Sequence, residues 1–272
     1  MGKTLYLVLS HSIEQDYDDI EDTCQNIKYF DPEADIIVNH PSSNHPNVKL
    51  RYKMQEIDTS RHVFSVLVNF LKYLDNNELH FDHLCWYSAN QYMIRDFKPK
   101  DQVNYVKFFN HPDWESVFTG KDFPNVVFGQ PFEGIQVGTN STRGKIYDPK
   151  NYYQELGIEI PMCHHWDLTT VTKEVVDLAR KHVDRVCEVY PVGEYGCDRS
   201  MTFLGYMALL SKQSWEFPPL FYSSVNISSP STHFCTVDQI IQKYNEQYSV
   251  VKRVGYKKGC HLRTFIRDNY MK

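Results

Sequence analysis

The opening of the chain constrains the fold most, because two short apolar segments flank an amphipathic one. Residues 4–10 (TLYLVLS) are almost uninterrupted apolar residues, as in strands that are buried on both faces. Apolar residues at near-helical spacing follow at Ile13, Ile20, Cys24 and Ile27, and Asp31-Pro32 ends this pattern. Residues 35–39 (DIIVN) indicate a second strand. This order predicts a βαβ unit with parallel strands and a right-handed crossover.

A second helix and a third strand extend this unit. Ser60 is placed to cap a helix whose apolar stripe comprises Val63, Val66, Leu67, Phe70, Leu71 and Leu74. Residues 81–87 (FDHLCWY) predict another interior strand, which ends at Ser88-Ala89-Asn90. All three strands therefore end in polar loops. Because ligands of open parallel sheets bind outside the carboxyl ends of the strands, we expect a ligand site at this edge.

The second part of the chain is less regular at first and then helical. Residues 97–160 are rich in Pro, Gly, Asn and aromatic residues, which predicts loops and short strands. Helices are expected over residues 170–187, after Asp198, and from a capping box at Thr236–Gln239. A last strand with a basic end is expected over residues 250–258. These elements predict one α/β domain over residues 1–272, with a central, mostly parallel sheet flanked by helices.

Composition and charge exclude several classes of protein. The net charge of −5 disfavours nonspecific binding to nucleic acid or anionic lipid, so any phosphate site must be local. No apolar window is long enough to span a membrane, and the N-terminus lacks a signal-peptide pattern, which predicts a soluble, cytoplasmic protein. The seven cysteines form no CxxC pair, so a disulfide framework or a zinc knuckle is not expected.

The common nucleotide and nucleophile motifs are missing from the sequence. There is no GxGxxG, no GxxxxGK[ST] and no GxSxG. A βαβ start without these glycines suits folds that hold a nucleoside by loops at the strand ends, and a diphosphate by a metal ion or by basic side chains. The nucleotide-sugar transferases of the GT-A type have this arrangement.

Five segments in order, together with the amphipathic helix expected over residues 62–74, resemble the core-2/I-branching glycosyltransferases and their viral and bacterial relatives. The segments are LYLVLSHS near the start, DIIVNHPSS (35–43), FDHLCWYSANQYMI (81–94), MCHHWDLTTVTKEVVDLA (162–179) and GEYGCDRSMTFLGYM (193–207). The resemblance implies a GT-A-like fold, with residues 1–96 as the nucleotide-sugar-binding half and residues 97–272 as the acceptor-binding and catalytic half. It also implies inverting transfer of a sugar, xylose or N-acetylglucosamine, from a UDP donor to a glycan hydroxyl.

The chain departs from the pattern of that family at two places. The loop Ser88–Tyr92 lacks the usual aspartate and proline, and Cys197-Asp198-Arg199 stands where the family has an acidic pair. Many eukaryotic members are anchored in the Golgi membrane, whereas this chain shows no anchor, which favours a soluble viral or bacterial enzyme.

The catalytic base should be a carboxylate near the start of the helix that follows Asp198. Inverting transfer needs such a group to take the proton of the acceptor hydroxyl. Asp198 is the first candidate and Glu194 the second, although an N-cap role for Asp198 and a solvated position for Glu194 are the alternatives. Glu133 could orient the acceptor or be a plain turn residue.

Donor and acceptor residues follow from the expected strand ends and from charge. The residues expected to contact the donor are His11, Ser12, His40, Ser88, Asn90, Arg253, Lys257 and Lys258. In the family, a late Arg/Lys pair replaces the metal, and the last three of these residues would take that role. His164, His165 and Trp166 could line a sugar cleft or pack in the core.

No cofactor is expected beyond the donor itself, and a metal is possible but not favoured. The one Asp-x-Asp, Asp16-Tyr17-Asp18, lies in the first helix region rather than after a strand, and Cys163-His164-His165 matches no compact zinc module. The expected partners are a nucleotide sugar and a glycan, without nucleic acid. Two other functions remain open, a metal-dependent hydrolase and a glycan-binding module without catalysis.

Overall fold

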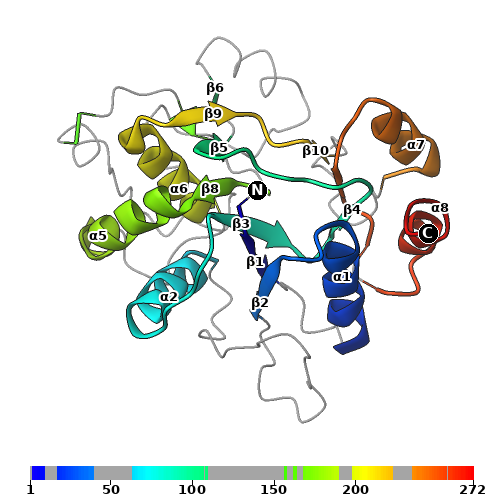
Figure 1. Cartoon of the computed structure of the whole chain (residues 1–272), viewed down its shortest axis with the longest axis horizontal. Helices are drawn as coiled ribbons and strands as arrows, with labels where there is room; N and C mark the ends of the chain where they lie inside the picture. The colour runs from blue at the N-terminus through cyan, green and yellow to red at the C-terminus, as the bar shows by residue number, and fades with distance from the viewer. Residues whose placement is uncertain are drawn as a thin grey trace, which may run out of the picture.

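A computed structural model describes residues 2–9, 17–39, 63–106, 108–109, 156–157, 162–163, 168–189, 198–222, 235–255 and 257–272. Its centre is a six-stranded sheet in the order β2-β1-β3-β8-β5-β9 (Figure 1). The strands are β1 (Thr4–Leu9), β2 (Asp35–Asn39), β3 (His83–Ser88), β5 (Val103–Tyr105), β8 (Thr170–Thr172) and β9 (Ser214–Glu216). β8 runs antiparallel to both of its neighbours, and the other strands share one direction. The protein is therefore α/β, with a mixed central sheet.

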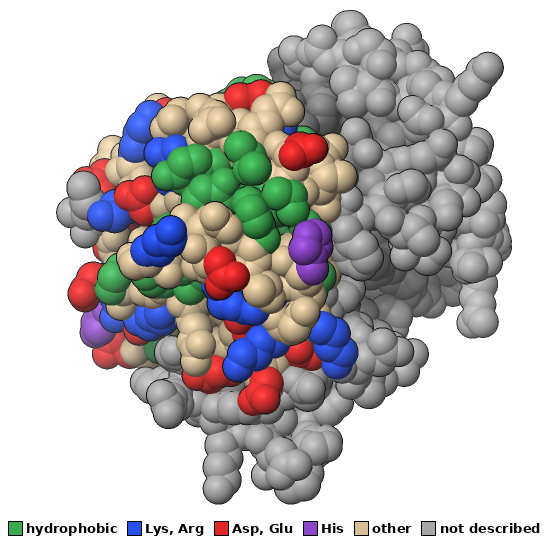
Figure 2. All heavy atoms as spheres, turned by 90° about the vertical axis from the view of Figure 1, so that its right-hand side faces the viewer, with side chains coloured by type: hydrophobic (Ala, Val, Ile, Leu, Met, Phe, Trp, Pro, Cys, Tyr) green, Lys and Arg blue, Asp and Glu red, His purple; other side chains and the backbone are tan. Residues whose placement is uncertain are grey.

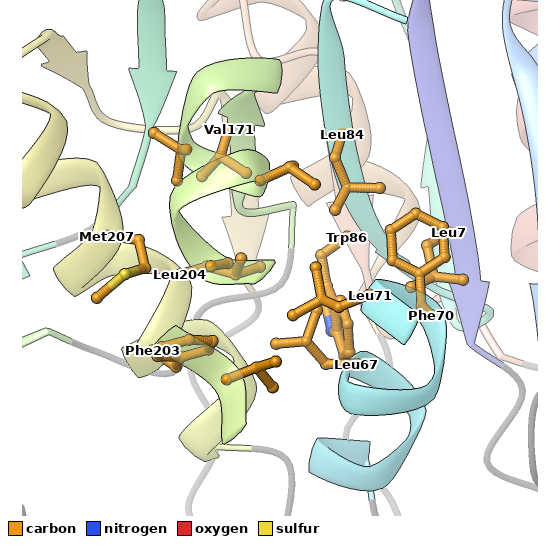
Figure 3. Close-up of a cluster of buried hydrophobic side chains, with 14 of the residues drawn as sticks. Leu7, Leu67, Phe70, Leu71, Leu84, Trp86, Val171, Phe203, Leu204 and Met207 are labelled. Atoms are coloured by element: carbon orange, nitrogen blue, oxygen red, sulfur yellow. The ribbon is translucent and has the colours of Figure 1, made fainter. Parts of the chain in front are cut away.

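The sheet is flanked by helices on both faces, because β1 and β3 are apolar on both faces. Every residue of β1 and of β3 is buried. One face packs against α2 (Val63–Asn76), α5 (Lys173–Val189) and α6 (Asp198–Ser211), and the other face against α1 (Tyr17–Phe30). Figure 3 shows the first of these cores, in which Trp86 of β3 belongs to the same cluster as side chains of α2 and α6.

A smaller sheet lies beside α1, in the order β10-β11-β4. It comprises β10 (Leu220–Tyr222), β11 (Val250–Lys252) and β4 (Gln91–Met93), and it packs with α7 (Val237–Asn245) and α8 (His261–Tyr270). The buried Asn26 of α1 binds the backbone of Met93 through both its Oδ1 (2.7 Å) and its Nδ2 (3.0 Å), so α1 covers the outer edge of β4. A separate two-stranded pair joins β6 (Phe108–Phe109) to β7 (Met162–Cys163).

The side of the molecule that carries α7 and α8 is partly apolar. Figure 2 looks onto this side and shows hydrophobic side chains gathered in one area, with charged side chains around it. Tyr244 of α7 and Tyr270 of α8 stack with ring centroids 4.4 Å apart. In the part of the chain that the structure describes, no helix is long and apolar enough to cross a membrane.

Most predicted elements are confirmed, including the βαβ unit, the stripe of α2, the start of α6 at Asp198 and the capping box of α7. The prediction of a strand over residues 250–258 was wrong beyond Lys252, and α8 was not predicted. The helix expected from residue 170 begins only at Lys173, because Thr170–Thr172 pairs with β3 and β5. The β-branched side chains of this segment suit a strand between two others.

One buried arginine of α8 ties three distant parts of the chain together. The Arg263 side chain is fully buried and forms an ion pair with Asp22 of α1, with Nη1 and Oδ2 3.0 Å apart. It also donates hydrogen bonds to the carbonyl oxygens of Asp19, Ala89 and Gly255 and to Thr23 Oγ1. The guanidinium thus links α1, the loop after β3 and the turn before α8.

Replacing this arginine should destabilise the fold strongly. Arg263→Met leaves the buried carboxylate of Asp22 with one partner fewer and several buried carbonyls unsatisfied, so we expect a loss of about 3–5 kcal/mol in the free energy of unfolding. Denaturant unfolding measures this loss. The matched control is Arg180→Met, which breaks an exposed pair with Asp75 and should cost at most about 1 kcal/mol. Equal losses in the two variants would contradict the role of Arg263.

Candidate active site

The carboxyl ends of β1, β2 and β3 meet at one edge of the central sheet, as the sequence predicted. In the parallel register, Leu9 lies opposite Asn39 on one side and Ser88 on the other. The chain passes from β1 to β2 on one side and returns to β3 on the other, while α1 and α2 cover opposite faces. This arrangement is a topological switch point, where open α/β sheets bind their ligands.

The loop after β3 is held tightly against β1. The amide of Ala89 donates to the carbonyl of Leu9 at 2.8 Å, and the amide of Ser88 donates to Gln91 Oε1 at 2.9 Å. The hydroxyl of Ser88, a buried residue, lies 2.8 Å from Asn90 Oδ1. Two predicted donor-binding residues, Ser88 and Asn90, therefore lie in a fixed turn at the switch point.

The basic end of β11 docks onto this same turn. The amide of Arg253 donates to the carbonyl of Asn90 at 3.0 Å, because β11 pairs with β4 directly after the loop. Arg253 has a φ of 70°, a conformation that is rare for a residue other than glycine. A third predicted donor-binding residue thus lies beside Asn90, although the two are far apart in the sequence.

The other two predicted basic residues, Lys257 and Lys258, lie at the first turns of α1. Lys257 Nζ is 3.0 Å from Oδ2 of the buried Asp19, and the backbone amide of Lys258 donates to Asp19 Oδ1 at 2.7 Å. Since α1 follows β1 directly in the chain, the structure brings these lysines to the helix that begins at the switch-point side of the sheet.

Sequence reasoning missed the neighbouring Lys252. This lysine is buried at the end of β11, and burial is the main reason that its pKa falls to about 7, with the positive charge of Arg253 as a second cause. The sequence signal that could have identified Lys252 was its position directly before Arg253, a predicted donor-binding residue. Below about pH 7 this lysine is mostly protonated and adds positive charge at the end of β11.

An exposed pair of aromatic residues was also missed. Trp215 in β9 is 44% exposed and Phe217 after it is 59% exposed, with ring centroids 5.8 Å apart. β9 runs in the same direction as β1, so Phe217 follows a strand that ends on the switch-point side. Exposed apolar side chains of this size often mark a binding surface.

Outside the described residues lie His11, Ser12, His40, Glu133, His164, His165, Trp166 and Glu194. The backbone of Asp198 begins α6, while its side chain is outside the description. In the described ranges, no group of three or more His, Cys, Asp or Glu residues could hold a metal ion.

Comparison with known proteins assigns the chain to no family. No protein-family model matches the chain, and a search of curated proteins finds no match. The fold and the site together define an α/β protein with a basic turn at the switch point of its sheet.

The titration of Lys252 should appear in the pH dependence of stability. Its pKa is about 7 in the folded protein and about 10.4 in the unfolded chain, so between pH 7 and 8.5 the unfolded state binds more protons. The free energy of unfolding attributable to Lys252 should therefore rise with pH, by up to about 1.4 kcal/mol per pH unit. Denaturant unfolding over this pH range gives the free energy of unfolding of the wild type and of Lys252→Met, and the difference between the two isolates the contribution of Lys252. If this difference stays constant with pH, the lowered pKa is refuted.

Proposed function

We propose that this protein is a glycosyltransferase with a GT-A-like fold, which moves a sugar from a UDP donor to a glycan hydroxyl with inversion. Xylose and N-acetylglucosamine are the sugars that the family resemblance favours. The observation that carries the proposal is the switch point, with the turn Ser88–Asn90 and the docked Arg253 at the carboxyl end of β3. A nucleoside diphosphate needs such an edge together with positive charge.

The basic segment after β11 supplies the chemistry that the leaving group needs. When the bond between the sugar and the diphosphate breaks, negative charge grows on the diphosphate, and positioned cations stabilise it. Arg253, Lys257 and Lys258 are the residues to which we assign this role, and the buried Lys252 would add to it. Such a segment makes a metal dispensable in the proposed mechanism.

The base is assigned to the start of α6. Asp198 is its first residue, and the helix is anchored by Phe203, Leu204 and Met207 in the core that it shares with α2 and α5 (Figure 3). A group on a packed helix is held more precisely than one on a loop. We therefore assign the base to Asp198 first and to Glu194 second, with Glu133 next. The exposed Trp215 and Phe217 could stack on acceptor sugar rings, as could His164, His165 and Trp166.

A nucleotide-sugar screen tests the proposal directly. A UDP-sugar at about 100 times its Kd should stabilise the fold by about 2.7 kcal/mol, because it binds only the folded state. This stabilisation should raise the melting temperature by several degrees, and UDP-xylose or UDP-N-acetylglucosamine should be consumed in the presence of glycan acceptors. EDTA should leave turnover largely intact. The donor site is refuted if no nucleotide or nucleotide sugar shifts melting, and the metal-free mechanism if manganese restores activity that EDTA removes.

Conservative variants of the two candidate bases should separate catalysis from folding. A positioned general base contributes about 10²–10⁴-fold, so Asp198→Asn or Glu194→Gln should lower kcat at least about 10²-fold with little change in donor binding or melting temperature. Steady-state kinetics and thermal melting measure the two effects. Near-normal turnover in both variants would move the base elsewhere, and a large loss of stability in Asp198→Asn would support an N-cap role instead.

A further inference from the structure

Gln91 has a buried side-chain amide, and only one of its two polar atoms forms a hydrogen bond within the described part of the protein. Its side chain is fully buried, and Oε1 accepts the amide of Ser88 at 2.9 Å. Nε2 has no hydrogen-bond partner among the described residues. Because buried donors in folded proteins are almost always satisfied, an unpaired amide at this position calls for an explanation.

The position of Gln91 relates this unpaired donor to the buried lysine of β11, Lys252. Gln91 and Lys252 are directly opposite in the antiparallel pair of β4 and β11, so their side chains lie on the same face, with Cβ atoms about 5 Å apart. Met93 and Val250 occupy the same face and pack in the core beneath α1. Gln91 and Lys252 continue this face toward the turn where Asn90 accepts the amide of Arg253.

We propose that Gln91 is a ligand-binding residue whose Nε2 donates a hydrogen bond to a phosphoryl oxygen held beside Lys252. A neutral donor next to a buried amine favours a group that only accepts hydrogen bonds and carries negative charge. Phosphoryl oxygens have both properties, whether they belong to inorganic pyrophosphate or to the diphosphate of a nucleotide. The nucleotide form of this inference rests on the proposed function, whereas the phosphoryl contact itself does not.

A second buried amide at the same edge serves as a comparison. Asn39 ends β2, and its Oδ1 is also without a partner among the described residues. An unpaired acceptor suits a hydroxyl or an N–H group and would repel a phosphoryl oxygen. Of these two amides, Gln91 is therefore the one to which we assign the phosphoryl contact.

Titration calorimetry with pyrophosphate and with UDP tests the assignment. Gln91→Glu keeps an oxygen for the amide of Ser88 but replaces the donor with a carboxylate, so both ligands should bind at least about 10-fold more weakly. Gln91→Leu removes the donor without adding charge and should weaken binding in the same direction. Gln102→Glu is the matched control, because it adds the same charge on an exposed residue before β5, and it should leave affinity unchanged.

Melting temperatures of all variants separate binding from folding. Wild-type affinity in folded Gln91→Glu and Gln91→Leu overturns the proposal, as does the absence of pyrophosphate and UDP binding in the wild type. An equal loss in Gln102→Glu also overturns it, since a general charge effect would then explain the result. If pyrophosphate binding depends on Gln91 but no nucleotide sugar binds, the contact stands and the proposed function fails. If nucleotide sugars bind and are consumed without any dependence on Gln91, the proposed function stands and the Gln91 contact fails.

Discussion

The buried ion pair between Arg263 and Asp22 is the interaction on which the geometry at the carboxyl ends of β1, β2 and β3 depends. A guanidinium without water around it needs protein acceptors for its N–H groups, and those acceptors come from α1, from Ala89 after β3 and from Gly255 before α8. Each of these segments is therefore fixed relative to the others. The turn that carries Asn90 and Arg253 lies within this fixed frame.

The small sheet gives the switch point its charge. A protein with a net charge of −5 has no general attraction for anions, so any phosphate site must be assembled locally. Pairing of β11 with β4 brings Lys252 and Arg253 to the turn after β3, and Asp19 holds Lys257 at α1. The acidic residues of α1 thus position the basic segment rather than simply repelling an anionic ligand.

Two errors in reading the sequence have the same physical cause. Residues 261–270 carry Leu262 and Ile266 at helical spacing, but no helix was predicted there, and the predicted elements ended with the strand over residues 250–258 and its basic end. Arg263 can be buried because Asp22 and three backbone carbonyls accept its hydrogen bonds. The partners in α1 and in the loop after β3 are separated from it by more than 170 residues in the sequence. In β8, pairing with β3 and β5 likewise decided where the strand ended and α5 began.

The sequence by itself determined the elements whose signals are local. Apolar runs specified β1, β2 and β3, one apolar stripe specified α2, and Thr236 with Gln239 specified the start of α7. From these, the shared carboxyl edge and the placement of Ser88 could be predicted. Only the tertiary structure decided that Asn90 meets Arg253 and that Gln91 faces Lys252. Strand pairing over such separations is set by long-range hydrogen bonds and burial, which leave no periodic pattern in the chain.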